Sequence, residues 1–194
     1  MNLGIASIPT PETTPISIED IHNPRWSYAV AKIHGEMAVV SSAIEHGRKC
    51  SIVRYHNVFG PKMGLDHFIP DFVKRAQAGR YQVQNAGASR SFLYVSDAVV
   101  GTISALLNAD CTSPIFHLGS SDERIILEAA QRILELMGLG ENKIEVTEGP
   151  SGSVQRRVPS IEKAQKILKW NPVVSFDEGI QKYLKSEGIN FFET

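Results

Sequence analysis

A tyrosine and a lysine, Tyr28 and Lys32, stand four residues apart in a stretch whose pattern predicts a helix. On one helical face their Cβ atoms would lie about 5–6 Å apart. The ammonium would then favour the phenolate and lower a phenol pKa that is ordinarily about 10. A phenol tuned in this way exchanges a proton with an alcohol at neutral pH. The same spacing also arises by chance, as an amphipathic tyrosine beside a solvated lysine.

The helix that must carry this pair is predicted over residues 25–46, with Gly47 as the stop. Its apolar residues cover more than one stripe, so we expect burial on two sides, against a sheet and against a partner subunit. A strand predicted at 50–55 follows closely, and helix and strand together indicate half of a parallel βαβ unit. Residues 56–61 end that strand, and ligands collect at the carboxyl ends of strands in open α/β sheets.

Short helices and strands alternate along the remaining chain. The predicted helices cover residues 68–78, 97–108, 124–137, 160–168 and 175–186, and the predicted strands cover 81–84, 91–95, 114–118 and 143–147. Ser96 or Asp97 is expected to cap the helix that follows the second of these strands. A polar loop is predicted at 148–158.

Composition predicts an ordinary globular protein of the cytoplasm. The chain is 42% hydrophobic and 21% charged, and its net charge of −1 argues against a nucleic-acid surface. Neither a membrane-spanning run nor a secretory signal is evident in the sequence. We interpret Cys50 and Cys111 as small reduced thiols. The six histidines lack a metal-ligand spacing, so we expect no metal and interpret each histidine as a surface or capping residue.

Several motifs in a fixed order resemble one protein family. They are Tyr-x-x-x-Lys at 28–32, Arg-Tyr-His-Asn-Val-Phe-Gly-Pro at 54–61, Arg-Ser-Phe-Leu-Tyr-Val-Ser-Asp at 90–97, Arg-x-Pro at 157–159 and Leu-Lys-Trp-Asn-Pro at 168–172. Together they resemble the NAD-dependent sugar-nucleotide epimerase/dehydratase family, the extended branch of the short-chain dehydrogenase/reductases. The resemblance implies an α/β fold with a Rossmann-like parallel sheet and a small C-terminal α/β substrate lobe.

The resemblance also implies two catalytic residues. Tyr28 would be the acid/base that takes a proton from a sugar hydroxyl, and Lys32 would hold the nicotinamide ribose of NAD and depress the pKa of Tyr28. Tyr55 would lie near the nicotinamide. Hydride transfer from a sugar carbon to NAD would give a keto-sugar, which is then reduced on its other face, dehydrated or decarboxylated.

Three further residues would bind the substrate in this resemblance. Asn57 would hydrogen-bond the diphosphate of a nucleotide-sugar, and Arg90 and Arg157 would contact the diphosphate or the ribose. The alternative for Asn57 is a turn former. Arg54 and Asp97 are better explained structurally, by pairing at the end of a strand and by helix capping.

One part of the family pattern is not found. No Gly-rich turn joins a first strand to a first helix, where the pyrophosphate of NAD would lie. The sequence therefore resembles the C-terminal part of a full enzyme, with the N-terminal half of the sheet missing. We divide it into an irregular segment at 1–24, a Rossmann-like remnant at 25–65, and a mostly substrate-binding lobe at 66–194, some of whose segments return to the Rossmann-like layer.

Two classes of function follow from these observations. The first is part of a sugar-nucleotide enzyme, with UDP-glucose 4-epimerase chemistry placed slightly ahead of decarboxylase and dehydratase chemistry. The second is a non-catalytic homologue that dimerises or weakly binds a UDP-sugar. In either case the strand at 50–55 has lost sheet neighbours, and we expect a homodimer or larger homo-oligomer through the helix at 25–46. The isolated chain is predicted to have little affinity for NAD.

Overall fold

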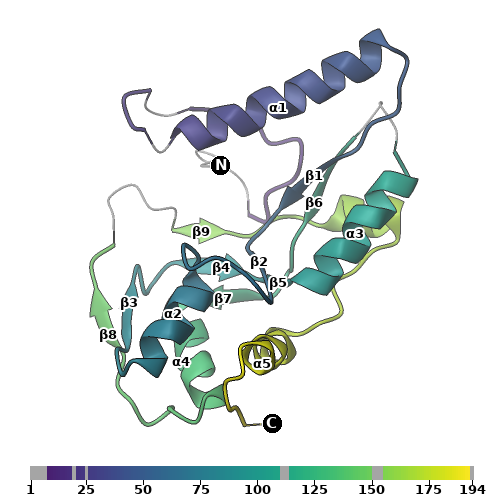
Figure 1. Ribbon diagram of the computed structural model, residues 1–194. Helices are drawn as coiled ribbons and strands as arrows, with labels where there is room; N and C mark the ends of the chain where they lie inside the picture. Colours follow the sequence, from purple (N-terminus) through teal and green to yellow (C-terminus); the bar gives the residue numbers. More distant parts are fainter. Residues whose placement is uncertain (1–7, 19–20, 25, 110–113, 150–154, 193–194) are drawn as a thin grey trace.

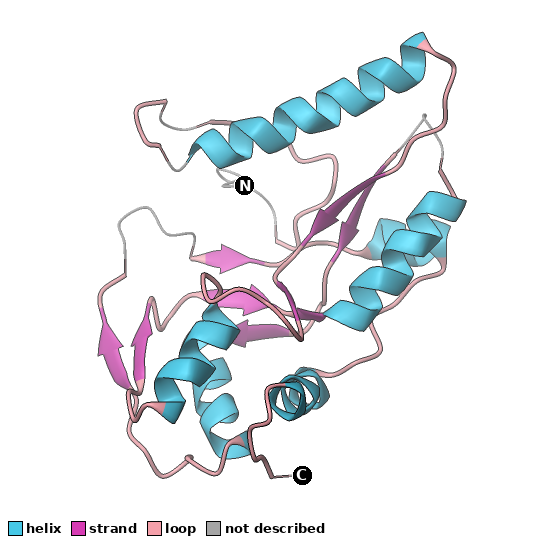
Figure 2. Ribbon diagram, in the orientation of Figure 1, coloured by secondary structure: helices cyan, strands magenta, loops and turns pink. Residues whose placement is uncertain are grey.

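The computed structural model of the chain describes residues 8–18, 21–24, 26–109, 114–149 and 155–192. They form a mixed α/β structure (Figures 1 and 2). The helices are α1 (Trp26–Glu45), α2 (Phe68–Gln77), α3 (Val95–Leu107), α4 (Ile126–Leu136), the π-helix Ala164–Leu168 and α5 (Phe176–Ser186). The strands are β1 (Ile52–Tyr55), β2 (Val58–Phe59), β3 (Gln82–Gln84), β4 (Ser89–Ser91), β5 (Leu93–Tyr94), β6 (Ile115–Leu118), β7 (Glu123–Ile125), β8 (Glu145–Thr147) and β9 (Arg156–Arg157).

Parallel pairing dominates the sheets, as the predicted βαβ pattern requires. The pairs β1–β6, β2–β5 and β3–β8 are all parallel, and β4 lies between antiparallel β7 and parallel β9. We call α1, β1, β6 and α3 the sheet layer. Figure 1 shows α1 and α3 on opposite sides of the β1–β6 pair. The Rossmann-like α/β arrangement expected from the sequence is present, as two described parallel strands between two helices.

The helices α2, α4 and α5 surround a closed apolar core, and we call these helices and their neighbouring strands the lobe. Phe72, Ile133, Leu134, Ile180 and Leu184 are completely buried there. The helices α4 and α5 contact each other, as do α2 and α4. Burial on this scale is the main favourable term that holds such a lobe together.

α3 packs closely against the sheet because a glycine lies at the contact. A Cβ on Gly101 would lie 2.7 Å from Cδ1 of Leu118 on β6, so a side chain there would push the helix outward. Trp170, which follows the π-helix, packs in the same cluster and donates from Nε1 to the carbonyl of Asp97 (3.0 Å). The Asp97 carboxylate accepts from the backbone N–H groups of Val173 and Val174, both at 2.9 Å.

Asp97 therefore has a structural role, but not the predicted one. The backbone cap of α3 is Tyr94, and no side chain caps this helix. Because Asp97 is the third residue of α3 and is 4% exposed, its carboxylate is directed to the segment before α5 instead.

Three strands were not predicted from the sequence. β2 lies within the segment 56–61 that was expected only to end the preceding strand, β9 lies within the polar loop predicted at 148–158, and β7 takes up the first two residues of the helix predicted at 124–137. The strands β7 and β9 are two or three residues long and pair with β4. Such short strands have no periodicity of their own and exist through pairing with a distant strand.

Within this chain α1 is largely exposed, and the burial predicted against a partner subunit stays a prediction. Of its twenty residues, only Ala29 and Ala43 are buried, whereas Met37 is 64% exposed. One face of α1 approaches β1 and its other apolar residues remain exposed to solvent. No helix in the described part of the chain is long and apolar enough to cross a membrane.

Candidate functional site

Tyr28 and Lys32 lie one turn apart near the N-terminus of α1, as the spacing predicts. The Lys32 ammonium lies 5.2 Å from the centroid of the Tyr28 ring, a cation–π distance. Tyr28 is 70% exposed. The ring and the cation are therefore adjacent and open to solvent.

A bidentate ion pair positions this helix on the sheet. Arg54 on β1 donates from Nε and Nη2 to the two carboxylate oxygens of Glu36, at 2.7 and 2.6 Å. The exposed fractions of these side chains are only 10% and 16%. This fork geometry fixes the orientation of the carboxylate as well as its distance, and it confirms the structural interpretation of Arg54.

The last residue of β1 and the turn that follows it provide two of the predicted site residues. Asn57 has a φ of 43°, a left-handed conformation that asparagine tolerates better than most residues, and its Nδ2 donates to the carbonyl of Ser91 (2.8 Å). The hydroxyl of Tyr55 is 2.7 Å from the hydroxyl of Thr102 on α3. Both side chains are thus held in place at the carboxyl end of β1.

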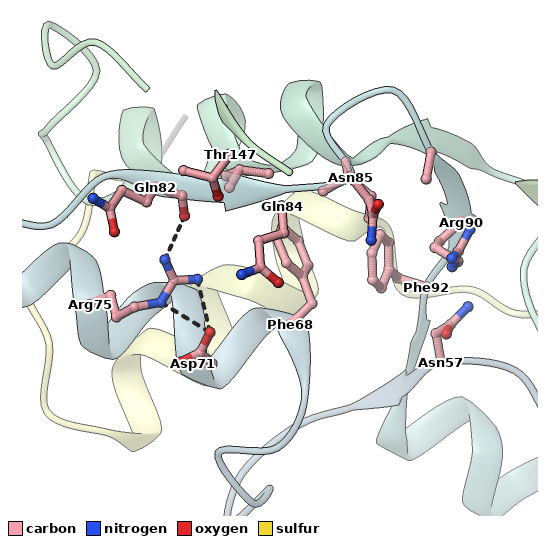
Figure 3. A pocket seen from close by; sticks show the side chains of 13 residues that line it. Asn57, Phe68, Asp71, Arg75, Gln82, Gln84, Asn85, Arg90, Phe92 and Thr147 are labelled. Atoms are coloured by element: carbon pink, nitrogen blue, oxygen red, sulfur yellow. Dashed lines mark hydrogen bonds and ion pairs between the residues drawn. The ribbon is translucent and has the colours of Figure 1, made fainter. Parts of the chain in front are cut away.

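A cavity of about 480 Å³ opens between α2, β3 and β4 (Figure 3). It is lined by Asn57, Phe68, Asp71, Arg75, Gln82, Val83, Gln84, Asn85, Ala88, Arg90, Phe92, Ile126 and Thr147. We call it the larger pocket. At one end Arg75 donates to Asp71 and to the carbonyl of Gln82 (2.5 Å), and at the other end Asn57, Arg90 and Phe92 lie together.

The two predicted substrate arginines are neighbours across the sheet. Arg90 on β4 is directly opposite Arg157 on β9 in the parallel register. Burial, followed by the Arg157 charge, lowers the pKa of Arg90 to about 10, and burial lowers the pKa of Arg157. Arg90 donates to the carbonyls of Ser89 (2.6 Å) and Gln155 (3.3 Å). Two adjacent, partly desolvated cations of this kind favour an anion between or beside them.

A second cavity, of about 100 Å³, lies beyond Asn57 and is lined by Thr10, Arg54, Tyr55, His56, Asn57, His117, Arg157, Val158 and Pro159. We call it the smaller cavity. Its residues come from the carboxyl ends of β1 and β6, from β9 and from the N-terminal segment, which is tied down where Thr10 donates to the Val158 carbonyl (2.9 Å).

Two histidines in this cavity correct the expectation that every histidine is a surface or capping residue. His117 is 2% exposed, and its ring lies 4.7 Å from that of His56 in an edge-to-face arrangement. Burial, then the charges of His117 and Arg157, lower the pKa of His56 to about 3. Burial also lowers the pKa of His117. Among the described residues, no cluster of three potential metal ligands exists.

The predicted site residues therefore fall into three places. Asn57 and Arg90 line the larger pocket, and Tyr55, Asn57 and Arg157 line the smaller cavity. Tyr28 and Lys32 line neither. Asn57 belongs to both cavities and is the point where they meet. Sequence reasoning missed Arg75, Phe68 and His117, since no local motif marks a residue that reaches a cavity from a separate helix or strand.

Comparison with known proteins decides the family. Residues 5–119 match the sequence profile of the NAD dependent epimerase/dehydratase family. The chain belongs to this family. The resemblance seen in the order of its motifs is thereby confirmed.

Two curated relatives are nucleotide-sugar decarboxylases. The chain is 34% identical over 163 residues to UDP-glucuronic acid decarboxylase 1 of Xenopus tropicalis, covering 82% of this chain and 38% of the relative. It is 32% identical over 171 residues to UDP-N-acetyl-alpha-D-glucosaminuronate decarboxylase of Bacillus cytotoxicus, covering 83% of this chain and 53% of the relative. The chain thus spans roughly two fifths to one half of these two curated relatives.

Solved structures of the family have the same fold. Epimerase Mth375 of Methanothermobacter thermautotrophicus superposes with a TM-score of 0.81 at 28% identity, covering 95% of this chain and 55% of that one. Almost the whole chain therefore corresponds to a little over half of a complete Rossmann-fold enzyme.

Proposed function

We propose that the larger pocket binds the nucleotide diphosphate of a UDP-sugar, through Arg90 and Asn57. The observation that carries this proposal is the charge distribution in the pocket. The Arg75 guanidinium is 2.8 Å from Asp71, so these two charges compensate each other. Arg90 and Arg157 lie directly opposite each other on β4 and β9, and the pKa of Arg90 is lowered by burial and by the charge of Arg157. An anion near Arg90 would relieve that repulsion.

The shape and lining of the pocket support the same ligand class. Its volume of about 480 Å³ lies within the range of small-molecule sites. Phe68 and Phe92 lie 6.0 Å apart and provide flat apolar surface for a base, whereas Gln82, Gln84 and Thr147 provide hydrogen-bonding groups for a base or a ribose. The printed names of the two decarboxylase relatives refer to UDP-sugars.

Calorimetric titration of the chain with UDP and with uridine tests this assignment. We expect UDP to bind and uridine to bind far more weakly, because uridine lacks the diphosphate. Arg90→Gln should weaken UDP binding by roughly tenfold or more, the equivalent of about 1.4 kcal/mol. Arg80→Gln is the matched control, since Arg80 is an exposed arginine outside the pocket. Equal affinity for UDP in the two variants would refute the assignment.

We also propose that Tyr28 is the acid/base residue of a complete enzyme and that Lys32 orients its cofactor. The adjacency of the phenol and the ammonium, both accessible from solvent, supports these roles. Tyr55 at the carboxyl end of β1 would complete the contacts to a nicotinamide. The bound nicotinamide cofactor would supply hydride transfer. The part of the chain described by the structure provides these nicotinamide-side residues, and the sequence offers no Gly-rich turn for the pyrophosphate.

A chain with residues for the nicotinamide but without a Gly-rich turn for the pyrophosphate is predicted to bind NAD weakly. Calorimetric titration of the chain alone with NAD should detect little or no binding, because the described residues offer the pyrophosphate of NAD no glycine-rich helix N-terminus. Titration with UDP under the same conditions is the control for a folded chain. Micromolar affinity for NAD would contradict the prediction.

Among possible reactions, we place decarboxylation of a UDP-uronic acid ahead of 4-epimerisation. Sequence alone favoured the epimerase, and the names of the curated relatives favour the decarboxylase. Binding of UDP-glucuronic acid in clear preference to UDP-glucose would support a uronic acid substrate, and the reverse preference would refute it. The second candidate function is non-catalytic binding of a UDP-sugar by a homo-oligomer. It is favoured by the exposed apolar side chains of α1.

A further inference from the structure

The smaller cavity contains buried polar nitrogen atoms that lack a hydrogen-bond partner among the described residues. They are Nε2 of His56, Nδ1 of His117 and Nε of Arg157. All three residues line the same cavity. Buried polar side-chain atoms are nearly always hydrogen-bonded in folded proteins, because leaving one without a partner costs about 1–3 kcal/mol. Three such atoms around one cavity point to a ligand that supplies the missing partners.

Charge decides which kind of ligand fits. Arg157 brings a buried positive charge to the wall, whereas the charge of Arg54 is compensated by its bidentate pair with Glu36. Glu12 accepts from the backbone N–H of His117 (2.9 Å) and does not line the cavity. A metal ion would have two imidazoles but would be repelled by Arg157. An anion is attracted by Arg157, and a phosphate group that carries one proton can accept from N–H groups and donate to an unprotonated ring nitrogen.

The two imidazoles suit this role as neutral hydrogen-bonding groups. The lowered pKa values of both rings leave them uncharged at neutral pH, and a neutral imidazole carries one N–H, whose position follows its surroundings. The ring of His56 can therefore direct its N–H to an acceptor in the cavity. The ring N–H of His117 already has backbone acceptors at Thr10 and Ser160, so its Nδ1 would accept from a protonated phosphate oxygen. The Arg157 Nε–H would be the second donor, from a different strand.

The size of the cavity limits the ligand to a small group. A volume of about 100 Å³ is a few times the roughly 30 Å³ that one water occupies in the liquid, so neither a base nor a sugar ring would fit. We propose that His56, His117 and Arg157 form a buried site for a tetrahedral phosphate group. Asn57 lines both cavities, so this phosphate group is either the terminal phosphate of a nucleotide in the larger pocket or free inorganic phosphate. The first source rests on the proposed function and the second does not.

Nitrogen-detected NMR of the histidine rings tests the site directly. In a uniformly ¹⁵N-labelled chain at constant ionic strength, inorganic phosphate should shift the ring nitrogens of His56 and His117. His46, an exposed histidine whose Nδ1 lies 2.9 Å from the carbonyl of Ser42, is the internal control and should not move. Unchanged His56 and His117 signals with inorganic phosphate, with UMP and with UDP would overturn the proposal.

The three probes also identify the source. If the site takes the terminal phosphate of a nucleotide, UDP shifts both rings and UMP does not. If it takes free phosphate, inorganic phosphate shifts them equally with and without saturating UDP. Failure of the proposed function would appear separately, as the absence of UDP binding in calorimetry while inorganic phosphate still shifts both rings.

Two variants attribute the binding to individual donors. His56→Phe removes one donor while keeping a ring of similar size, and Arg157→Lys keeps the charge but removes the Nε–H. Each should weaken phosphate binding by about tenfold relative to the unaltered chain. Arg156→Lys on the exposed side of β9 is the control and should bind phosphate normally. Far-ultraviolet circular dichroism establishes that each variant is folded. Undiminished binding in both folded variants would refute the assignment.

Discussion

Segments α1 and α4 are both regular α-helices, but they differ greatly in how many of their residues are buried. The eleven residues of α4 include six that are buried, whereas the twenty residues of α1 include only two, both alanines. The apolar face of α4 meets α2 and α5 within the same chain. Much of the apolar surface of α1 meets solvent, with Met37 and Ile44 64% and 70% exposed. The comparison shows that an apolar pattern identifies a face to be covered without identifying what covers it.

The same contrast separates the lobe from the sheet layer as a whole. α3 also presents exposed apolar side chains, among them Val99, Ile103 and Leu106. The described part of β1 pairs only with β6. Regions with few buried contacts open at lower free energy than closed cores. We therefore expect the lobe to be the stable unit and α1 to be the first helix to open.

The largest expected effect is on the lobe core. Phe72→Ala removes a completely buried ring that stacks on Phe68 at 5.8 Å, and it should lower the free energy of unfolding by about 3–5 kcal/mol. Met37→Ala on α1 is the matched control and should change it by less than about 0.5 kcal/mol. Urea denaturation followed by circular dichroism measures both. A comparable loss in the two variants would remove the distinction between the regions.

The next effect concerns the attachment of α1 to the sheet. Glu36→Gln leaves the half-buried Arg54 without a carboxylate and should destabilise this attachment by about 2–3 kcal/mol. Amide hydrogen exchange should accelerate in α1 and remain slow in α4. The double variant Glu36→Gln, Arg54→Met should recover part of the loss, because it removes the uncompensated charge. Faster exchange spread evenly over both helices would contradict a local role.

A smaller loss of folding stability is expected as the pH falls. The pKa of His56 is about 3 in the folded chain and about 6.5 when unfolded, so between these values the unfolded state binds more protons. Stability is therefore complete above pH 6.5 and declines as the pH falls towards 3. The slope expected from His56 alone is at most about 1.4 kcal/mol per pH unit, or roughly 2 kcal/mol between pH 6.5 and 5, and His117, whose pKa is also lowered, adds in the same direction. His56→Phe should flatten the profile of unfolding free energy against pH, and a steeper or unchanged profile would contradict this origin.

The smallest effect on stability is expected at the candidate catalytic pair. Tyr28→Phe keeps the ring beside Lys32 and removes only an exposed hydroxyl, so thermal unfolding should change by less than about 0.5 kcal/mol. UDP binding should also persist, because Tyr28 lies outside the larger pocket. Loss of either property would show that the tyrosine has a structural role in addition to any chemical one.

Sequence reasoning located the longer elements where local signals are strong. α1 and α2 end within one or two residues of the predictions, because Gly47 and Gly79 adopt positive φ values of 61° and 70°. α5 begins where Ser175 accepts from the backbone N–H of Glu178. The strands β7 and β9 were not predicted, since β4 is their template and lies more than thirty residues from each.

The candidate site was predictable only in part for the same reason. Asn57 and Arg90 belong to motifs with a fixed order, and the structure brings them to one pocket. The His56–His117 contact joins residues 61 positions apart (117 − 56) through the pairing of β1 with β6. Neither histidine has a local pattern that predicts burial. The roles proposed for Tyr28, Lys32 and Tyr55 remain predictions that depend on a bound cofactor.

The buried carboxylate of Asp97 has a mechanical consequence. It accepts from Val173 and Val174, and its backbone carbonyl accepts from Trp170, so three hydrogen bonds connect the start of α3 to the segment that leads into α5. α3 belongs to the sheet layer and α5 to the lobe. A rotation of the lobe relative to the sheet layer must therefore carry α3 with it or break these bonds. Any movement that follows ligand binding should pivot about Asp97, with the greatest displacement at the parts of the lobe farthest from it.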